Sequence, residues 1–462
     1  MANLALDDLD DEKQLSLAAY LSKNCKRVSE LIISYDEEPF GCTTSPDFWL
    51  GLQPLAPRLN TLVVQNVSIR ATRRFFSDFL SLCSNLESLT YRPMCAYGWT
   101  DFDDEERNGD IVQAFSTLKK LKHLRLTIDY FQSDGGRFLA VFSSATALET
   151  FDVRHFKLSY YRTFNPSHVA VAIEGRTGIL HTFRTSSYLN ADLLRSLVPS
   201  SYKEPLLQEL EFILEGRSLT YDEHMELIRS SFERMRHLRI LRVRTSGCLF
   251  VDVGAPFDPK ILFAILNSCP PCLTTFHFDH VHALMRKRTD RYAADFSRSL
   301  NRFAPTLREL RLNVARVSEL TILPWSKMIE LRCLSLDDCN LVDYAFLLSL
   351  ISLQKLVLKP TSVTRTFLRE LSKSVPRQLE ELLLSCRDYV GEDGYERRPT
   401  KDDWSELFRS SPALRSVTLV QVDAAVTRHN YVKHVVEWAR VAFPTIWFTY
   451  RTQNSALLDR HL

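Results

Sequence analysis

The sequence lacks the features that mark membrane and secreted proteins. No stretch approaches about eighteen uninterrupted apolar residues, the shortest length typical of a membrane-spanning helix. The amino-terminal segment MANLALDDLDDE is acidic, whereas a signal peptide begins with basic residues followed by an apolar run. We therefore expect a protein that does not associate with membranes and lies in the cytoplasm or the nucleus.

The chain also lacks an excess of charge of either sign. It contains 58 lysines and arginines against 56 aspartates and glutamates, which gives a formal net charge of +2. Because basic and acidic residues are nearly equal in number, the net charge does not favour binding to nucleic acid. No nucleic-acid partner is expected.

Motifs of common nucleotide-binding and hydrolytic sites are missing as well. None of G-x-x-x-x-G-K-[ST], G-x-S-x-G or H-E-x-x-H occurs. The ten cysteines in 462 residues are typical of reduced, buried thiols rather than of a disulfide framework. Cys269 and Cys272 have C-x-x-C spacing, but a zinc site normally needs a second pair and none occurs, so we interpret this segment as a turn. We expect neither an enzyme nor a bound cofactor or metal.

A repeated apolar pattern is what the sequence does contain. Leu331–Leu341, LRCLSLDDCNL, has leucine at relative positions one, four, six and eleven and cysteine at position nine, which matches the leucine-rich-repeat template. Its L-x-x-L-x-L kernel recurs in looser form about fifteen times, at intervals of about 30 residues. The first kernel is Val28-Leu31-Ile33 and the last is Phe443-Ile446-Phe448.

The kernels and the segments between them predict one architecture. Apolar residues with period two lie on one side of a short strand. Segments with helical spacing, such as Arg74–Cys83 and Phe367–Ser372, separate the kernels. A single strand and helix cannot bury the apolar side alone, so the repeats must stack. We predict an α/β leucine-rich-repeat solenoid, a horseshoe of about fifteen irregular repeats with a parallel sheet on the concave face and helices on the convex face.

Domain boundaries follow from the first and last kernels. Residues 1–27 are expected to form an N-terminal helical cap, because Gln14–Asn24 carries enough apolar residues for one amphipathic helix. Residues 28–450 are expected to form the solenoid, and residues 451–462 a C-terminal tail. No linker interrupts the repeats.

Candidate binding residues come from the outward positions of the kernel. Counted from the first apolar residue, positions three, five and seven should face the concave side. Position five alternates in charge along five successive repeats, which predicts a cross-strand ladder. Two interpretations stay open: a self-neutralising solvated face, or a recognition strip for a protein partner, whose basic surplus would suit an acidic or phosphorylated segment. The candidates on the strip are Arg125, Asp152, Arg154, Arg184, Glu211, Arg242, Arg244, His277 and Arg311.

Long insertions form a second candidate surface. Tyr91–Asp110, Arg244–Pro259 and Cys386–Asp403 all follow predicted strands, so they should lie at one rim of the sheet. Exposed aromatic side chains are favoured anchors of protein interfaces. The candidates in these loops are Tyr97, Trp99, Tyr389 and Tyr395.

The repeats resemble those of a known family. The variable repeat length, the cysteine-containing segment Leu331–Leu341, and the phrases Cys83-Ser-Asn-Leu86 and Cys269-Pro-Pro-Cys-Leu273 are similar to the repeat region of irregular F-box/leucine-rich-repeat proteins common in fungi. The resemblance implies repeats that select substrates for ubiquitin ligation, and an F-box that holds the ligase adaptor. Residues 1–27 are too few for an F-box and lack its Leu-Pro opening.

The sequence therefore predicts a non-enzymatic protein-interaction scaffold. One alternative is the substrate-recognition subunit of an SCF-type ubiquitin ligase with a missing or divergent F-box, for which the ligase adaptor would be a partner. Another is metal or small-ligand binding near His277–His282, a segment rich in potential ligands.

Overall fold

A computed structural model describes most of the 462-residue chain. The described residues are those outside sixteen segments: 7–8, 35–41, 69–71, 93–104, 129–136, 156–163, 202–203, 215–221, 246–258, 280–288, 314–322, 338–343, 361–362, 387–398, 423–429 and 454–462. The chain divides into two compact units. Unit 1 comprises Met1–Leu238 and Cys248–Val251, and unit 2 comprises Arg239–Gly247 and Asp252–Leu462.

Unit 1 alternates strands and helices along the chain. Its described strands β1, β2, β4, β6, β7, β8, β9 and β10 follow one another in that order in a parallel sheet. The elements are β1 (Ala2–Ala5), α1 (Asp11–Asn24), β2 (Glu30–Ser34), β3 (Cys42–Thr43), α2 (Pro46–Leu52), the 3₁₀ helix η1 (Gln53–Arg58), β4 (Thr61–Gln65), β5 (Val67–Ser68), α3 (Arg73–Ser81), β6 (Ser88–Arg92), α4 (Glu105–Ser116), β7 (His123–Ile128), η3 (Arg137–Ser144), β8 (Thr150–His155), α5 (Pro166–Ile173), β9 (Thr182–Tyr188), α6 (Ala191–Leu197), β10 (Glu209–Leu214) and α7 (Asp222–Arg234). Strands β3 and β5 pair with each other in a small parallel sheet.

Unit 2 has the same alternation, and its strands β11 to β18 also pair in sequence order, all parallel. The elements are β11 (Ile240–Thr245), α8 (Pro259–Ser268), β12 (Thr275–Phe278), α10 (Thr289–Leu300), β13 (Glu309–Asn313), η5 (Trp325–Lys327), β14 (Cys333–Asp337), η6 (Ala345–Ser349), β15 (Lys355–Lys359), α11 (Arg365–Ser374), β16 (Glu381–Cys386), α12 (Lys401–Ser410), β17 (Ser416–Val422), α13 (Asn430–Ala442) and β18 (Trp447–Gln453).

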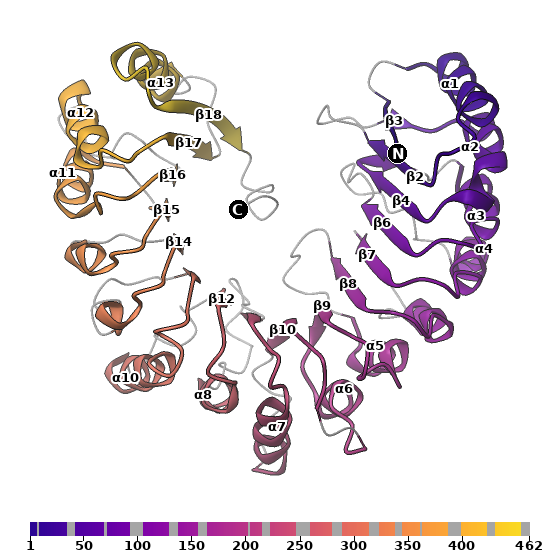
Figure 1. Cartoon of the computed structure of the whole chain (residues 1–462), viewed down its shortest axis with the longest axis horizontal. Helices are drawn as coiled ribbons and strands as arrows, with labels where there is room; N and C mark the ends of the chain where they lie inside the picture. Colours follow the sequence, from indigo (N-terminus) through magenta and orange to yellow (C-terminus); the bar gives the residue numbers. More distant parts are fainter. Residues whose placement is uncertain are drawn as a thin grey trace. The chain divides into compact units, whose positions relative to one another are not determined.

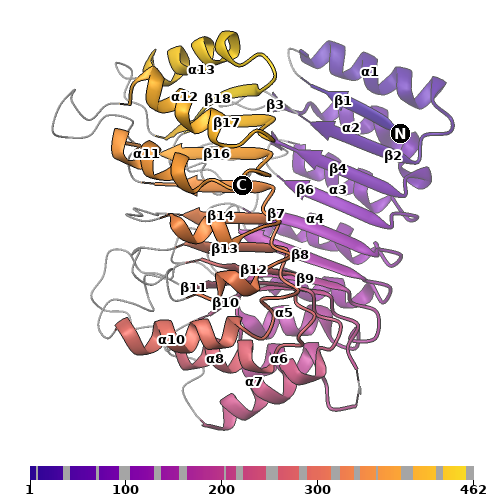
Figure 2. The same cartoon turned by 60° about the vertical axis from the view of Figure 1, so that its left-hand side comes forward.

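In each unit the described helices lie along one face of the sheet (Figures 1 and 2). The kernel side chains on that face form the core: Leu62 and Leu124 in unit 1, and Leu310 and Leu334 in unit 2, are fully buried. The α/β class and the repeated parallel strand are thus confirmed. We call the opposite face of each sheet the helix-free face.

The strand registers show that equal kernel positions of successive repeats lie opposite one another. In unit 1, position five of β7, β8 and β9 is occupied by Arg125, Asp152 and Arg184, and these residues lie opposite one another. In unit 2, His277 and Arg311 pair in the same way. A shared backbone hydrogen bond fixes this register, because the amides at positions two and three of one repeat donate to the position-two carbonyl of the repeat before.

The last kernel is an exception, and its predicted register is wrong. The kernel Phe443-Ile446-Phe448 placed Trp447 at position five, opposite Thr418. In the structure Thr418 lies opposite Thr449, and Trp447 lies opposite Ser416, at position three. A shift of two residues leaves every side chain on its original face, so apolar alternation alone does not distinguish the two registers.

The segment before the first kernel contains more than the expected helix. Helix α1 begins at Asp11, where the side chain of Asp10 accepts a hydrogen bond from the amide of Lys13, as expected of an N-cap. Ahead of it, β1 pairs in parallel with β2. Leu4 is buried, so this segment contributes a strand to the sheet of unit 1.

No helix among the described residues is long and apolar enough to cross a membrane.

Candidate interaction face

Ion pairs link neighbouring strands on the helix-free face of unit 1. Arg184 on β9 contacts Asp152 on β8 at 3.2 Å and Glu209 on β10 at 2.7 Å. Arg154, at position seven of β8, contacts Asp152 at 2.7 Å and Glu211 at 3.6 Å. Each arginine therefore bridges two carboxylates.

This network differs in detail from the predicted ladder. The predicted ladder joined Arg184 to Glu211, its direct neighbour at position five, but Arg184 forms its ion pair on β10 with Glu209 at position three. An arginine is long enough to reach a diagonal neighbour on the adjacent strand. The side chains of Asp152 and Glu211 are only 6% and 2% exposed, so this part of the face is not freely solvated.

Arg125 stands apart from the network. It lies opposite Asp152 in register and its side chain is exposed, and no ion pair of it is found among the described residues. Ile32, Val63 and Thr90 occupy position five on β2, β4 and β6, and all three are half-buried. The accessible part of this row is thus a small, mostly apolar surface that ends in one cation.

His277 is held between two strands on the helix-free face of unit 2. Arg242 Nε lies 3.2 Å from His277 Nδ1, and His277 Nε2 lies 2.8 Å from Glu309. A guanidinium only donates, so Nδ1 accepts and Nε2 carries the proton that is donated to Glu309. The hydrogen bond from His277 keeps the pKa of Glu309 below its usual value, against an opposing effect of burial.

A second cluster of unit 2 is centred on Asp337, at position seven of β14. Its carboxylate lies 3.0 Å from both Arg311 on β13 and Lys359 on β15. Burial alone would raise the pKa of Asp337, but these two cations outweigh it and the pKa is lowered. Arg311 also lies 4.0 Å from Asp279, which is 3.6 Å from Arg244.

The structure thus brings most of the strip candidates into polar networks, one in unit 1 and two in unit 2. The four loop candidates, Tyr97, Trp99, Tyr389 and Tyr395, lie outside the described residues, as do His280 and His282. In the described part of the chain no group of three or more potential ligands could hold a metal ion. Cys269 is buried, Cys272 is exposed, and both lie in the turn between α8 and β12.

Sequence reasoning passed over two members of the networks. Asp337 and Lys359 both occupy position seven, so the same kernel count that selected Arg154 and Arg244 would have found them. They were missed because the selection followed charge alternation at position five, whereas the carboxylate of Asp337 pairs directly with Lys359 at position seven and diagonally with Arg311 at position five.

Comparison with protein-family models gave no match for this chain, and comparison with curated proteins gave none either. The family resemblance noted in the sequence remains an expectation.

Proposed function

We propose that this chain is a non-enzymatic leucine-rich-repeat scaffold, and that a protein partner binds the concave, helix-free face of its sheet. The row Ile32, Val63, Thr90 and Arg125 in unit 1 is the observation that carries the proposal. No described helix lies over it, and it combines half-buried apolar groups with an exposed cation. Apolar groups beside a charged rim are typical of protein interfaces.

The adjoining ion pairs support the same role in a different way. Asp152, Arg184 and Glu209 are already paired with one another. A partner does not have to order these side chains, which lowers the entropic cost of binding. The partner's own charge should be negative where it meets Arg125, as an acidic or phosphorylated segment would be.

Affinity capture from cell extract with the whole chain as bait tests the proposal, followed by titration of the recovered partner. Arg125→Glu should weaken partner binding about tenfold or more, because it replaces attraction by repulsion at an exposed site. The matched control is Arg195→Glu on helix α6 of the same unit, where the arginine side chain is 65% exposed. Equal affinity of Arg125→Glu and the parent protein would rule out this face as the binding surface.

Arg184→Glu is less suitable as a probe. It would place a third carboxylate against Asp152 and Glu209, so a loss of binding could reflect a disturbed sheet. Recovery of a ligase adaptor and a cullin in the capture would instead favour the ubiquitin-ligase role, and a partner set without them would count against it.

A further inference from the structure

We propose that Arg365 and Arg369 of helix α11 form a binding site for a phosphate-class oxyanion, which a buried carboxylate on the neighbouring helix α12 holds in shape. Both helices belong to unit 2 and lie on the helix-covered side of its sheet. The site is therefore separate from the interaction face, and it does not depend on the proposed function.

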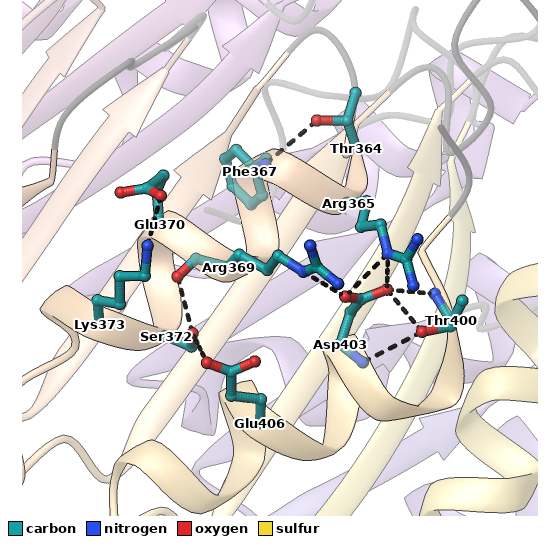
Figure 3. A network of polar contacts seen from close by, with 10 residues as sticks. All are labelled: Thr364, Arg365, Phe367, Arg369, Glu370, Ser372, Lys373, Thr400, Asp403 and Glu406. Atoms are coloured by element: carbon teal, nitrogen blue, oxygen red, sulfur yellow. Dashed lines mark hydrogen bonds and ion pairs between the residues drawn. The ribbon is translucent and has the colours of Figure 1, made fainter. Parts of the chain in front are cut away.

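Asp403 is the centre of this cluster (Figure 3). Its side chain is 2% exposed, and Oδ2 accepts hydrogen bonds from the amide of Thr400 at 2.8 Å and the hydroxyl of Thr400 at 2.6 Å. Thr400 in turn caps α12, since its hydroxyl accepts a bond from the amide of Asp403. The reciprocal cap fixes the carboxylate relative to the first turn of the helix.

The two arginines approach this carboxylate from α11. Arg369 Nε lies 2.9 Å from Oδ1, and Arg365 Nε lies 3.1 Å from Oδ2 and 3.2 Å from Oδ1. Residues four apart lie on the same face of a helix, where two like charges repel each other. Asp403 removes this repulsion and keeps the guanidinium groups together.

Each arginine uses only its inner nitrogen for this contact. Among the described residues, no hydrogen bond involves the terminal Nη atoms of Arg365 or Arg369. The side chains are 42% and 50% exposed, so a ligand in solvent can reach them. A guanidinium has five N–H donors, so each arginine keeps four for an external acceptor.

The charge and geometry of the site select the class of ligand. Two guanidinium groups and one carboxylate leave one positive charge, and a phosphate monoester carries about −1.5 to −2 at pH 7. Planar guanidinium groups bind phosphate oxygens in pairs, which a single-point cation does not. Glu406 lies farther along α12, where its carboxylate accepts a hydrogen bond from the hydroxyl of Ser372.

A purely structural role would use the arginines only to neutralise Asp403. Burial alone would raise the pKa of Asp403, but the hydrogen bonds from Thr400, Arg369 and Arg365 outweigh it, so the carboxylate is ionised. One arginine would balance this single charge. The second arginine leaves a positive charge on a half-exposed side chain, which an anionic ligand requires.

Titration of the whole chain with inorganic phosphate and with a phosphoserine peptide, followed by calorimetry, tests the proposal. We expect saturable one-site binding of at least one probe, weakened about tenfold by Arg365→Gln or by Arg369→Gln, since each removes charged hydrogen bonds. Arg365→Lys keeps the charge but loses the paired donors, and it should also weaken binding. Tighter binding of the peptide than of free phosphate, lost in the unphosphorylated peptide, would identify a modified protein segment as the source of the phosphate.

The matched control is Lys373→Gln, which removes a cation from the same helix that already pairs with Glu370 at 2.8 Å. It should leave affinity unchanged. Thermal melting of every variant separates lost binding from lost folding. The proposal is overturned if neither probe saturates, or if folded Arg365→Gln and Arg369→Gln proteins bind as tightly as the control.

Discussion

Arg176 carries a positive charge into the interior of unit 1. Only 3% of the residue is exposed, and its guanidinium donates to the carbonyl oxygens of five residues. The acceptors are Phe142, Ser143, Ala145, Ala172 and Glu174, at 2.6–3.1 Å. Burial lowers the pKa of Arg176, yet these carbonyl groups compensate the charge. They belong to the ends of η3 and α5, where helices leave carbonyl groups without intrahelical partners.

Arg176→Met should therefore destabilise the protein strongly. The substitution keeps an apolar stem but leaves the buried carbonyl groups without donors, a loss on the order of 3–5 kcal/mol. Arg195→Met is the matched control, since Arg195 is 65% exposed and should cost less than about 1 kcal/mol. Urea unfolding followed by circular dichroism measures both. A loss of unfolding free energy below about 1 kcal/mol for Arg176→Met would show that the buried guanidinium does not stabilise unit 1 through these carbonyl groups.

Asp337 should contribute a stability that depends on pH. Its pKa is lower in the folded protein than the ordinary value of 3.8, so the folded state favours the ionised form. The contribution is complete well above pH 3.8 and is lost as the pH falls through that value toward the folded pKa. Asp337→Asn should be less stable than the parent protein at pH 7 by about 3 kcal/mol, because Arg311 and Lys359 lose their buried partner.

The difference between the two proteins should shrink as the pH falls below about 4, since protonation removes the same charge from the parent. Urea unfolding at pH 7, 5, 4 and 3 measures it. A difference independent of pH would show that the pKa of Asp337 is the same in the folded and unfolded states.

The sequence predicted which residues face outward but not which of them pair. Side chains alternate between the two faces of a strand, so the face of each residue depends only on its place in the strand. Counting from the kernel therefore placed Arg184 and Asp152 correctly on one face. Pairing depends on side-chain reach across strands, and there Arg184 contacts Glu209 rather than Glu211. Asp403 and Arg176 lie outside the kernels, so no periodic signal marked them.

At the scale of elements, apolar spacing predicted helices well and the outermost strands poorly. The stretches Arg74–Cys83 and Phe367–Ser372 correspond to α3 and α11. Strand β1 was missed because four residues give too short an apolar pattern to recognise. Strand β18 was predicted, but its register was wrong by two residues, because a shift of two leaves the apolar side chains on the same face.

Cysteine crosslinking distinguishes the two registers of β18. Thr418 and Thr449 lie directly opposite each other, within the range of Cα separations, about 4.4–6.8 Å, that a disulfide tolerates. Thr418 and Trp447 are offset by two residues, which puts their Cα atoms about 8 Å apart. Thr418→Cys with Thr449→Cys should form an intramolecular disulfide on mild oxidation, identified by peptide mass spectrometry. Efficient crosslinking of Thr418→Cys with Trp447→Cys instead would restore the register predicted from the sequence.

At the scale of the whole molecule, repetition limits how far a local change spreads. In each unit the strands of the main sheet pair in the order of the chain, with β3 and β5 forming a separate pair, and helices pack beside their neighbours along the chain. The stability of such an array is approximately a sum over repeats and the interfaces between neighbours. The networks around Asp152 and Asp337 are local in the same sense, because each joins consecutive strands only.

Hydrogen exchange followed by mass spectrometry tests this locality with Arg176→Met. We expect faster exchange in β7, β8 and β9, which flank η3 and α5, the elements that Arg176 joins in unit 1, and little change in β15, β16 and β17 of unit 2. The reason is that a weakened repeat loses its own interfaces first, while distant repeats keep theirs. Arg195→Met should leave protection unchanged in both sets of strands. Equal loss of protection in all six strands would show that the array unfolds as one cooperative block, and the ion-pair networks would then stabilise the whole sheet rather than their own repeats.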